Sequence, residues 1–155
     1  MNNILISACV AASLILTACG NGKAAVIQPE TAADTLLAVK LSIGDMEFTA
    51  KLYDNDTARE LVSRMPMELD MSELHGNEKY YYLSEGLPAD AENPGNIHTG
   101  DLMLYGSDCM VLFYEDFQSS FSYTRLGYLE NPAGLPEALG AGSVTVTFEA
   151  VDSAG

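Results

Sequence analysis

Basic residues are scarce in this chain of 155 residues. Seven Lys and Arg stand against 22 Asp and Glu, which gives a formal net charge of −15. So acidic a chain repels a nucleic-acid backbone and an anionic membrane surface, and we expect neither as a partner. The simplest interpretation of the excess charge is a solvated acidic surface. The length fits one domain with a sizeable core.

Histidine and cysteine are also rare. His75 and His98 have no His-x-His or His-x-x-x-His spacing, so we expect no metal site. Cys9 and Cys19 fall in the N-terminal segment, which leaves no pair for a disulfide in the rest of the chain. Cys109 stands in an apolar run, where a buried hydrophobic role is favoured over a nucleophilic one. A nucleophile elbow, a phosphate loop and a dinucleotide fingerprint are all missing, so we expect no cofactor.

Residues 1–19 have the pattern of a signal peptide. The apolar run from Ile4 to Leu16 is too short to span a bilayer comfortably and suits a signal peptide's hydrophobic region. It leads into Leu16-Thr17-Ala18-Cys19, which resembles a bacterial lipobox, although Met1-Asn2-Asn3 lacks the usual basic residue. We therefore expect lipid on Cys19 and an extracytoplasmic protein that is anchored to the bacterial cell membrane only through this lipid. Residues 20–35 are rich in small residues and suit a flexible tether.

Residues 36–152 are expected to form one domain dominated by strands. Val39 to Ile43 and Met46 to Leu52 alternate apolar and polar residues on either side of Gly44-Asp45, which predicts a hairpin with one buried face. Val144 to Ala150 alternates in the same way. Seven or eight strands with only two helices favour a closed antiparallel β-barrel. Pairing of the first strand with the last would remove the exposed edges.

Two short helices interrupt the strands. Thr57-Ala58-Arg59-Glu60 matches a capping box, which predicts Thr57 as the N-cap, and Pro66 ends the helix. Asn131-Pro132 is expected to supply the N-cap and first residue of the second helix, with Gly140 as its C-cap.

The longest apolar runs after the N-terminal segment lie in the middle of the chain. Asp101 to Tyr105 and Cys109 to Tyr114 flank Gly106-Ser107-Asp108, a pattern typical of a hairpin. Because residues on both sides of these strands are apolar, we expect both faces to be covered, with one face in the core and the other against a helix or a ligand.

This central stretch carries a family resemblance. His98-Thr99-Gly100 before Leu102-Met103-Leu104 resembles a cyclophilin segment that leads into an inner strand, and Val111 to Tyr114 resembles the strand paired with it. Leu126 to Leu129, followed by Gly134 to Leu139, is similar to a later cyclophilin strand and its short helix. In element order the chain is most similar to the compact bacterial cyclophilin-like domain family, over roughly residues 37–151. The resemblance implies a cyclophilin-like barrel.

The departures from the cyclophilin pattern bear on activity. The resemblance implies that an isomerase of this fold uses an Arg donor, a Gln-Phe-Phe strand, and a Trp and a His beside the proline. Here Val111-Leu112-Phe113 replaces Gln-Phe-Phe, the matching segment has no Arg, and the chain has no Trp. Electrostatic assistance to amide rotation needs a preorganised donor. Two hypotheses stay open: a non-catalytic binding module, and an atypical peptidyl-prolyl isomerase whose donor is Arg125 or Arg59.

Aromatic residues mark the candidate ligand site. They are more numerous than the barrel core easily hides, and Arg125 lies among them in the sequence. Aromatic side chains around a single cation suit a peptide or an anionic small molecule. The alternative is that the tyrosines pack in the fold and point their hydroxyls to water. We expect a monomer whose ligand, a peptide or a small molecule, contacts Tyr81, Tyr105, Phe113, Phe121, Tyr123 and Arg125.

Overall fold

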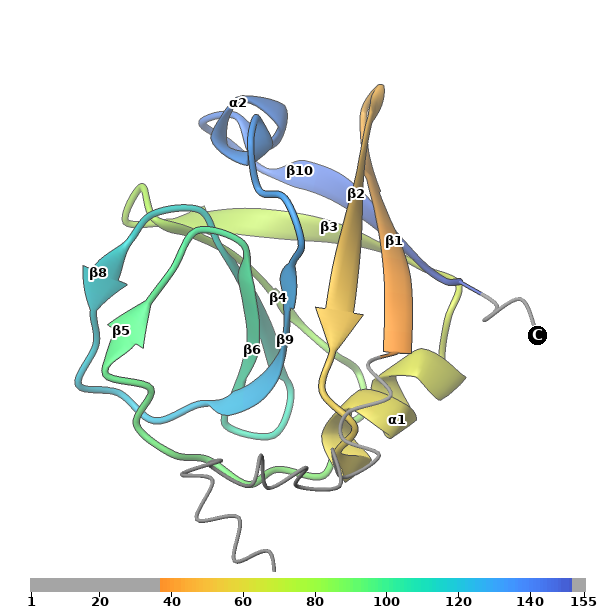
Figure 1. Cartoon of the computed structure of the whole chain (residues 1–155), viewed down its shortest axis with the longest axis vertical. Helices are drawn as coiled ribbons and strands as arrows, with labels where there is room; N and C mark the ends of the chain where they lie inside the picture. Colours follow the sequence, from red (N-terminus) through yellow and green to blue (C-terminus); the bar gives the residue numbers. More distant parts are fainter. Residues whose placement is uncertain (1–36, 152–155) are drawn as a thin grey trace, which may run out of the picture. The chain divides into compact units, whose positions relative to one another are not determined.

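The alternating strands close into a barrel. A computed structural model describes residues 37–151, so the expected signal peptide, Cys19 and the expected tether lie outside the described residues. Eight strands form a closed barrel in the order β1-β10-β3-β4-β7-β6-β9-β2, and a separate two-stranded sheet pairs β5 with β8 (Figure 1). The expected closed antiparallel barrel with two short helices is confirmed. Its elements are β1 (Leu37–Ile43), β2 (Met46–Leu52), α1 (Asp56–Ser63), β3 (Met67–Leu74), β4 (Glu78–Tyr82), β5 (Asn96–Ile97), β6 (Asp101–Tyr105), β7 (Cys109–Phe113), β8 (Phe117–Gln118), β9 (Thr124–Leu129), α2 (Leu135–Leu139) and β10 (Val144–Ala150).

Strand β1 closes the barrel because it pairs with β2 on one side and with β10 on the other. Leu41 lies opposite Phe48 of β2 on one side and opposite Phe148 of β10 on the other. All three side chains are buried in the main core. The expected pairing of the first and last strands is therefore confirmed, and it leaves no open edge for another strand to join.

Gly127 allows β9 to approach β2 closely. A Cβ built at this position would lie 2.1 Å from the carbonyl oxygen of Lys51. Any side chain would separate the two strands, so glycine at this position is needed for barrel closure.

Both helices begin at residues other than those expected. The N-cap of α1 is Asn55, whose Oδ1 accepts a hydrogen bond of 2.8 Å from the backbone N–H of Ala58. The Thr57 hydroxyl instead donates to the carbonyl of Pro88 at 2.6 Å and ties the helix to a loop. The predicted capping box was therefore wrong, because Asn55 has taken over the capping role.

The second helix, α2, starts later than expected. Its N-cap is Gly134, with Pro136 in the first turn. Asn131 makes a local turn in which its Oδ1 accepts from the N–H of Ala133 at 3.1 Å, so the predicted Asn131-Pro132 start was wrong. The predicted C-cap at Gly140 is confirmed.

Strand β7 is covered on both faces, as expected. Met110 and Leu112 belong to the main core. Cys109, Val111 and Phe113 point to the other face and form a second apolar cluster with residues that include Ile97 of β5, while Phe117 of β8 packs against it. The small β5–β8 sheet therefore lies over the outer face of the barrel beside β7.

A charged side chain is fully buried at one end of the barrel. The Lys79 ammonium contacts Glu73 Oε2 at 2.5 Å and the carbonyl oxygens of Gly140 and Gly142 at 2.8 and 2.6 Å. The Tyr114 hydroxyl lies 2.8 Å from both carboxylate oxygens of Glu73. We call Glu73, Lys79 and Tyr114 the lysine network. It joins β3 and β4 to the loop between α2 and β10.

No helix within residues 37–151 is long and apolar enough to cross a membrane.

Candidate ligand-binding groove

Strand β4 directs alternate side chains to opposite faces of the barrel wall. Lys79 and Tyr81 point to one face, and Glu78, Tyr80 and Tyr82 point to the other. The neighbouring strands β7 and β6 add side chains to the face that carries Glu78, Tyr80 and Tyr82.

The register of the neighbouring strands extends the aromatic row. Tyr80 of β4 lies opposite Val111 of β7, and Tyr82 lies opposite Cys109. Cys109 in turn lies opposite Tyr105 of β6. Because paired residues project to the same face of a sheet, these side chains form a continuous surface.

This surface is the floor of a groove of about 570 Å³. The volume lies in the range of small-ligand sites. Its walls come from the β3–β4 turn and from the polypeptide that follows β7. We call it the aromatic groove, and it is lined by Leu74, His75, Asn77, Glu78, Tyr80, Tyr82, Tyr105, Cys109, Val111, Phe117, Phe121 and Tyr123.

Three large rings of the groove are open to solvent. Tyr82 is 61% exposed, Phe121 60% and Tyr105 45%. The Tyr105 ring lies 6.2 Å from that of Phe121 at 90° and 5.6 Å from that of Tyr123 at 54°. Tyr80 and Tyr82 meet at 5.8 Å and 77°. The rings are inclined to one another and not stacked face to face.

Polar groups of the groove are few. Glu78 is half-buried, and this burial raises the pKa of its carboxyl, while nearby His75 partly opposes the shift. The Asn77 Oδ1 atom is buried and has no hydrogen-bond partner within residues 37–151. Burial raises the pKa of the Cys109 thiol, which favours the unreactive thiol over the thiolate. The described residues include no cluster of His, Cys, Asp and Glu able to hold a metal ion.

The expected ligand-contacting residues are only partly brought together. Tyr105, Phe121 and Tyr123 line the aromatic groove. Phe113 lies beneath it, fully buried, with the rings of Phe117 and Tyr123 at 5.6 and 5.5 Å. Tyr81 packs against the main core on the other side of β4.

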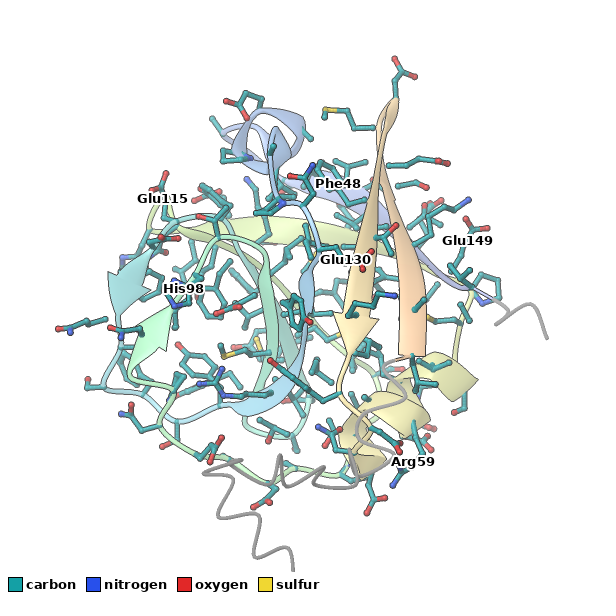
Figure 2. The ribbon with its side chains drawn as sticks, viewed as in Figure 1. Phe48, Arg59, His98, Glu115, Glu130 and Glu149 are labelled. Carbon is teal, nitrogen blue, oxygen red and sulfur yellow. The ribbon has the colours of Figure 1, made fainter. Side chains whose placement is uncertain are left out.

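Arg125 lies outside the aromatic groove. Its guanidinium donates to the carbonyl of Pro94 at 3.3 Å and lies 3.5 Å from a Glu92 carboxylate oxygen. It borders a separate hollow of about 340 Å³ together with α1 residues such as Asp56. The other candidate donor, Arg59, is a residue of α1 and pairs with Asp54 and Asp56 (Figure 2).

Sequence reasoning missed three residues on the groove-facing side of β4. Glu78, Tyr80 and Tyr82 share a period of two, so choosing either Tyr80 or Tyr82 as a ligand contact would have found all three. The sequence Tyr80-Tyr81-Tyr82 gives no sign of which side faces out, because all three residues are the same.

Comparisons with known proteins agree on the fold. A profile described as "Cyclophilin-like family" matches residues 41–149. Among solved structures, the chain is similar to the solution structure of the hypothetical protein AF2241 from Archaeoglobus fulgidus, with 14% identity and a TM-score of 0.55. The match covers 76% of this chain and 97% of that one. No curated protein matches. At this identity the structural likeness shows the fold alone.

Proposed function

Because the chain belongs to the cyclophilin-like family, we propose that it is a monomeric binding module whose aromatic groove holds a peptide or a small molecule. The observation that carries this proposal is the gathering of three exposed rings, Tyr82, Tyr105 and Phe121, in one hollow. Single exposed apolar side chains are ordinary, but exposed rings gathered in a concave site suit a ligand.

The groove lacks what prolyl isomerisation requires. Within residues 37–151 no Lys or Arg lines it, so no ammonium or guanidinium donor of these residues is directed at a bound imide. Val111 occupies the strand position where the isomerases of the fold carry an amide. Phe113, which remains from the Gln-Phe-Phe pattern, is covered by Phe117 and Tyr123. These features favour binding without catalysis.

Binding is tested with blocked pentapeptides in which only the central residue varies, titrated into the full-length protein in a non-ionic detergent. At least one peptide should bind, and Tyr105→Ala should weaken that binding about tenfold, since stacking contacts contribute on the order of 1–2 kcal/mol. Tyr128→Ala is the control, because Tyr128 pairs with Tyr53 at 5.9 Å and does not line the groove. No binding at millimolar peptide, or equal binding by the Tyr105→Ala variant, would overturn the proposal.

The alternative function, an atypical isomerase, is tested on the same protein with a coupled assay of Xaa-Pro peptides. The uncatalysed barrier is about 20 kcal/mol, and we expect no acceleration over the background rate. Turnover that disappears in Arg125→Ala would favour the alternative, with Arg125 as the donor.

We also propose that the module is lipid-anchored outside the cytoplasm. Support comes from the sequence Leu16-Thr17-Ala18-Cys19 after an apolar run. Lipoproteins carry more than one acyl chain, which makes anchoring stable. In cell fractionation, Cys19→Ala should leave the membrane fraction, whereas the matched Cys9→Ala should remain in it. Retention of the Cys19→Ala variant in the membrane like wild type would refute the anchor.

A further inference from the structure

The charge of the aromatic groove indicates the class of ligand, provided that the groove is a binding site as proposed above. Its lining residues include one carboxylate, Glu78, and no Lys or Arg. An anionic ligand would therefore meet the Glu78 carboxylate with no Lys or Arg in the lining to offset it, and His75 is the one basic side chain there. The chain as a whole, with a net charge of −15, adds to that repulsion.

Within residues 37–151, no Lys or Arg is paired with Glu78, and His75 is the basic residue that acts on it. Of its seven Lys and Arg residues, only Lys23 lies outside the described part of the chain. Each of the other six has a carboxylate partner within 4.0 Å, and in no case is that partner Glu78. These pairs are Lys40 with Glu47 and Glu149, Lys51 with Glu130, Arg59 with Asp54 and Asp56, Arg64 with Glu60, Lys79 with Glu73, and Arg125 with Glu92.

We propose that the aromatic groove binds a primary ammonium or guanidinium group on an apolar stem, with Glu78 as its counter-charge. Lys and Arg side chains of a peptide carry this chemistry, and so do free alkylamines. The rings of Tyr80 and Tyr82 lie on the same face of β4 as Glu78. The apolar stem of the ligand can therefore contact the rings while its cation contacts the carboxylate.

Three physical terms favour such a ligand. The face of a tyrosine ring attracts a cation, by about 0.5–2 kcal/mol depending on desolvation. Burial removes part of the hydration of the Glu78 carboxylate, which raises the pKa of its carboxyl, and a bound ammonium would compensate for this loss by pairing with the carboxylate. Asn77 also lines the groove, and its buried Oδ1 is an acceptor that has no hydrogen-bond partner within residues 37–151. Ammonium and guanidinium groups both have N–H donors for such acceptors, which a quaternary ammonium lacks.

The test uses four blocked pentapeptides, Ala-Ala-X-Ala-Ala with Lys, Arg, norleucine or Glu at X, titrated calorimetrically into the full-length protein in non-ionic detergent. We expect the Lys and Arg peptides to bind about tenfold more tightly than the norleucine peptide, and the Glu peptide to bind most weakly. Glu78→Gln should remove the tenfold preference, measured as the ratio of Lys-peptide to norleucine-peptide affinity in the same variant. Glu137→Gln, which removes the same charge from an exposed position on α2, should retain the preference.

The outcomes separate this inference from the proposed function. If the norleucine peptide binds as tightly as the Lys peptide, and Tyr105→Ala weakens both, the groove is a binding site but does not select cations. The same conclusion follows if the preference survives in Glu78→Gln. If no peptide binds, the proposed function and this inference both fail. An added n-butylamine arm distinguishes the sources: competition with the Lys peptide at equal concentration indicates a free amine, and weak competition indicates a peptide.

Discussion

Two glutamates on one hairpin, Glu73 and Glu78, have opposite environments. Glu73 is paired with Lys79 across β3 and β4, and the next pair is Leu74 with Glu78. Burial alone would raise the pKa of Glu73, but hydrogen bonds from Lys79, Tyr114 and the Gly76 N–H bring it below its usual value. The pKa of Glu78 is raised, with burial as the main cause.

The difference arises from the geometry of the strands. Neighbouring cross-strand pairs project to opposite faces, so Glu73 and Lys79 share one face, where two carbonyl groups complete the lysine network. Leu74 and Glu78 share the other face, which opens into the aromatic groove. The first carboxylate has its partners within the protein and stabilises the fold, whereas the second is paired with no Lys or Arg of residues 37–151 and has His75 as the basic group that acts on it.

Removing the lysine network should give the largest change in stability. Glu73→Ala leaves the fully buried Lys79 ammonium with only carbonyl partners, and loss of one member of a buried ion pair costs about 3–5 kcal/mol. Urea denaturation of the purified protein measures the change in the free energy of unfolding. A loss below about 1 kcal/mol would mean that the network contributes little to the fold.

A milder change to the same network is Tyr114→Phe. Burial and the Glu73 hydrogen bond raise the pKa of Tyr114 to about 12, so its hydroxyl stays protonated and donates throughout the physiological range. Loss of a hydrogen bond to a charged group should lower the free energy of unfolding by about 1.5–3 kcal/mol. Tyr128→Phe is the control, expected to change stability by less than about 0.5 kcal/mol. If both substitutions lower the free energy of unfolding equally, the loss in Tyr114→Phe does not come from the lysine network.

Local patterns predict the barrel well because alternation and turn chemistry act over short distances. The β1–β2 hairpin, the doubly covered β7 and the closure by β10 follow from period-two runs and the position of Gly44. The helix starts were less predictable. At α1, Asn55 and Thr57 are both good caps, and the choice depended on Pro88, 31 residues away from Thr57.

The site was harder to predict than the fold, because it depends on which face of β4 points outward. A shift of one residue exchanges Tyr81 for Tyr80 and Tyr82. Arg125 is close in sequence to Tyr123, yet its guanidinium turns to Pro94 and Glu92. Burial of Lys79 depends on Gly140 and Gly142, more than 60 residues away, and no local pattern indicates it.

The smallest expected effect is the change in stability on Glu78→Gln, and its sign distinguishes the two glutamates. A carboxyl whose folded pKa is raised destabilises the protein while it is ionised, and this cost is relieved as the pH falls through the folded pKa toward the unfolded one. Glu78→Gln should therefore raise the free energy of unfolding at pH 7, by less than about 1 kcal/mol. The gain should shrink toward zero as the pH falls to the ordinary range of a glutamate.

Glu73→Ala should show the reverse sign in the same titration. The folded pKa of Glu73 is lowered, so its stabilisation is complete above the unfolded pKa and is lost as the pH falls through the folded value. At neutral pH, Glu73→Ala should therefore have a lower free energy of unfolding than the wild type. This difference should shrink at a more acidic pH than the one at which the gain in Glu78→Gln shrinks. His75 and Glu73 are the titratable groups that act on Glu78, and His75→Gln in both backgrounds measures the histidine contribution. Urea denaturation from pH 3 to pH 8 gives both curves, and curves of the same sign would mean that Glu78, like Glu73, has its partner within the protein.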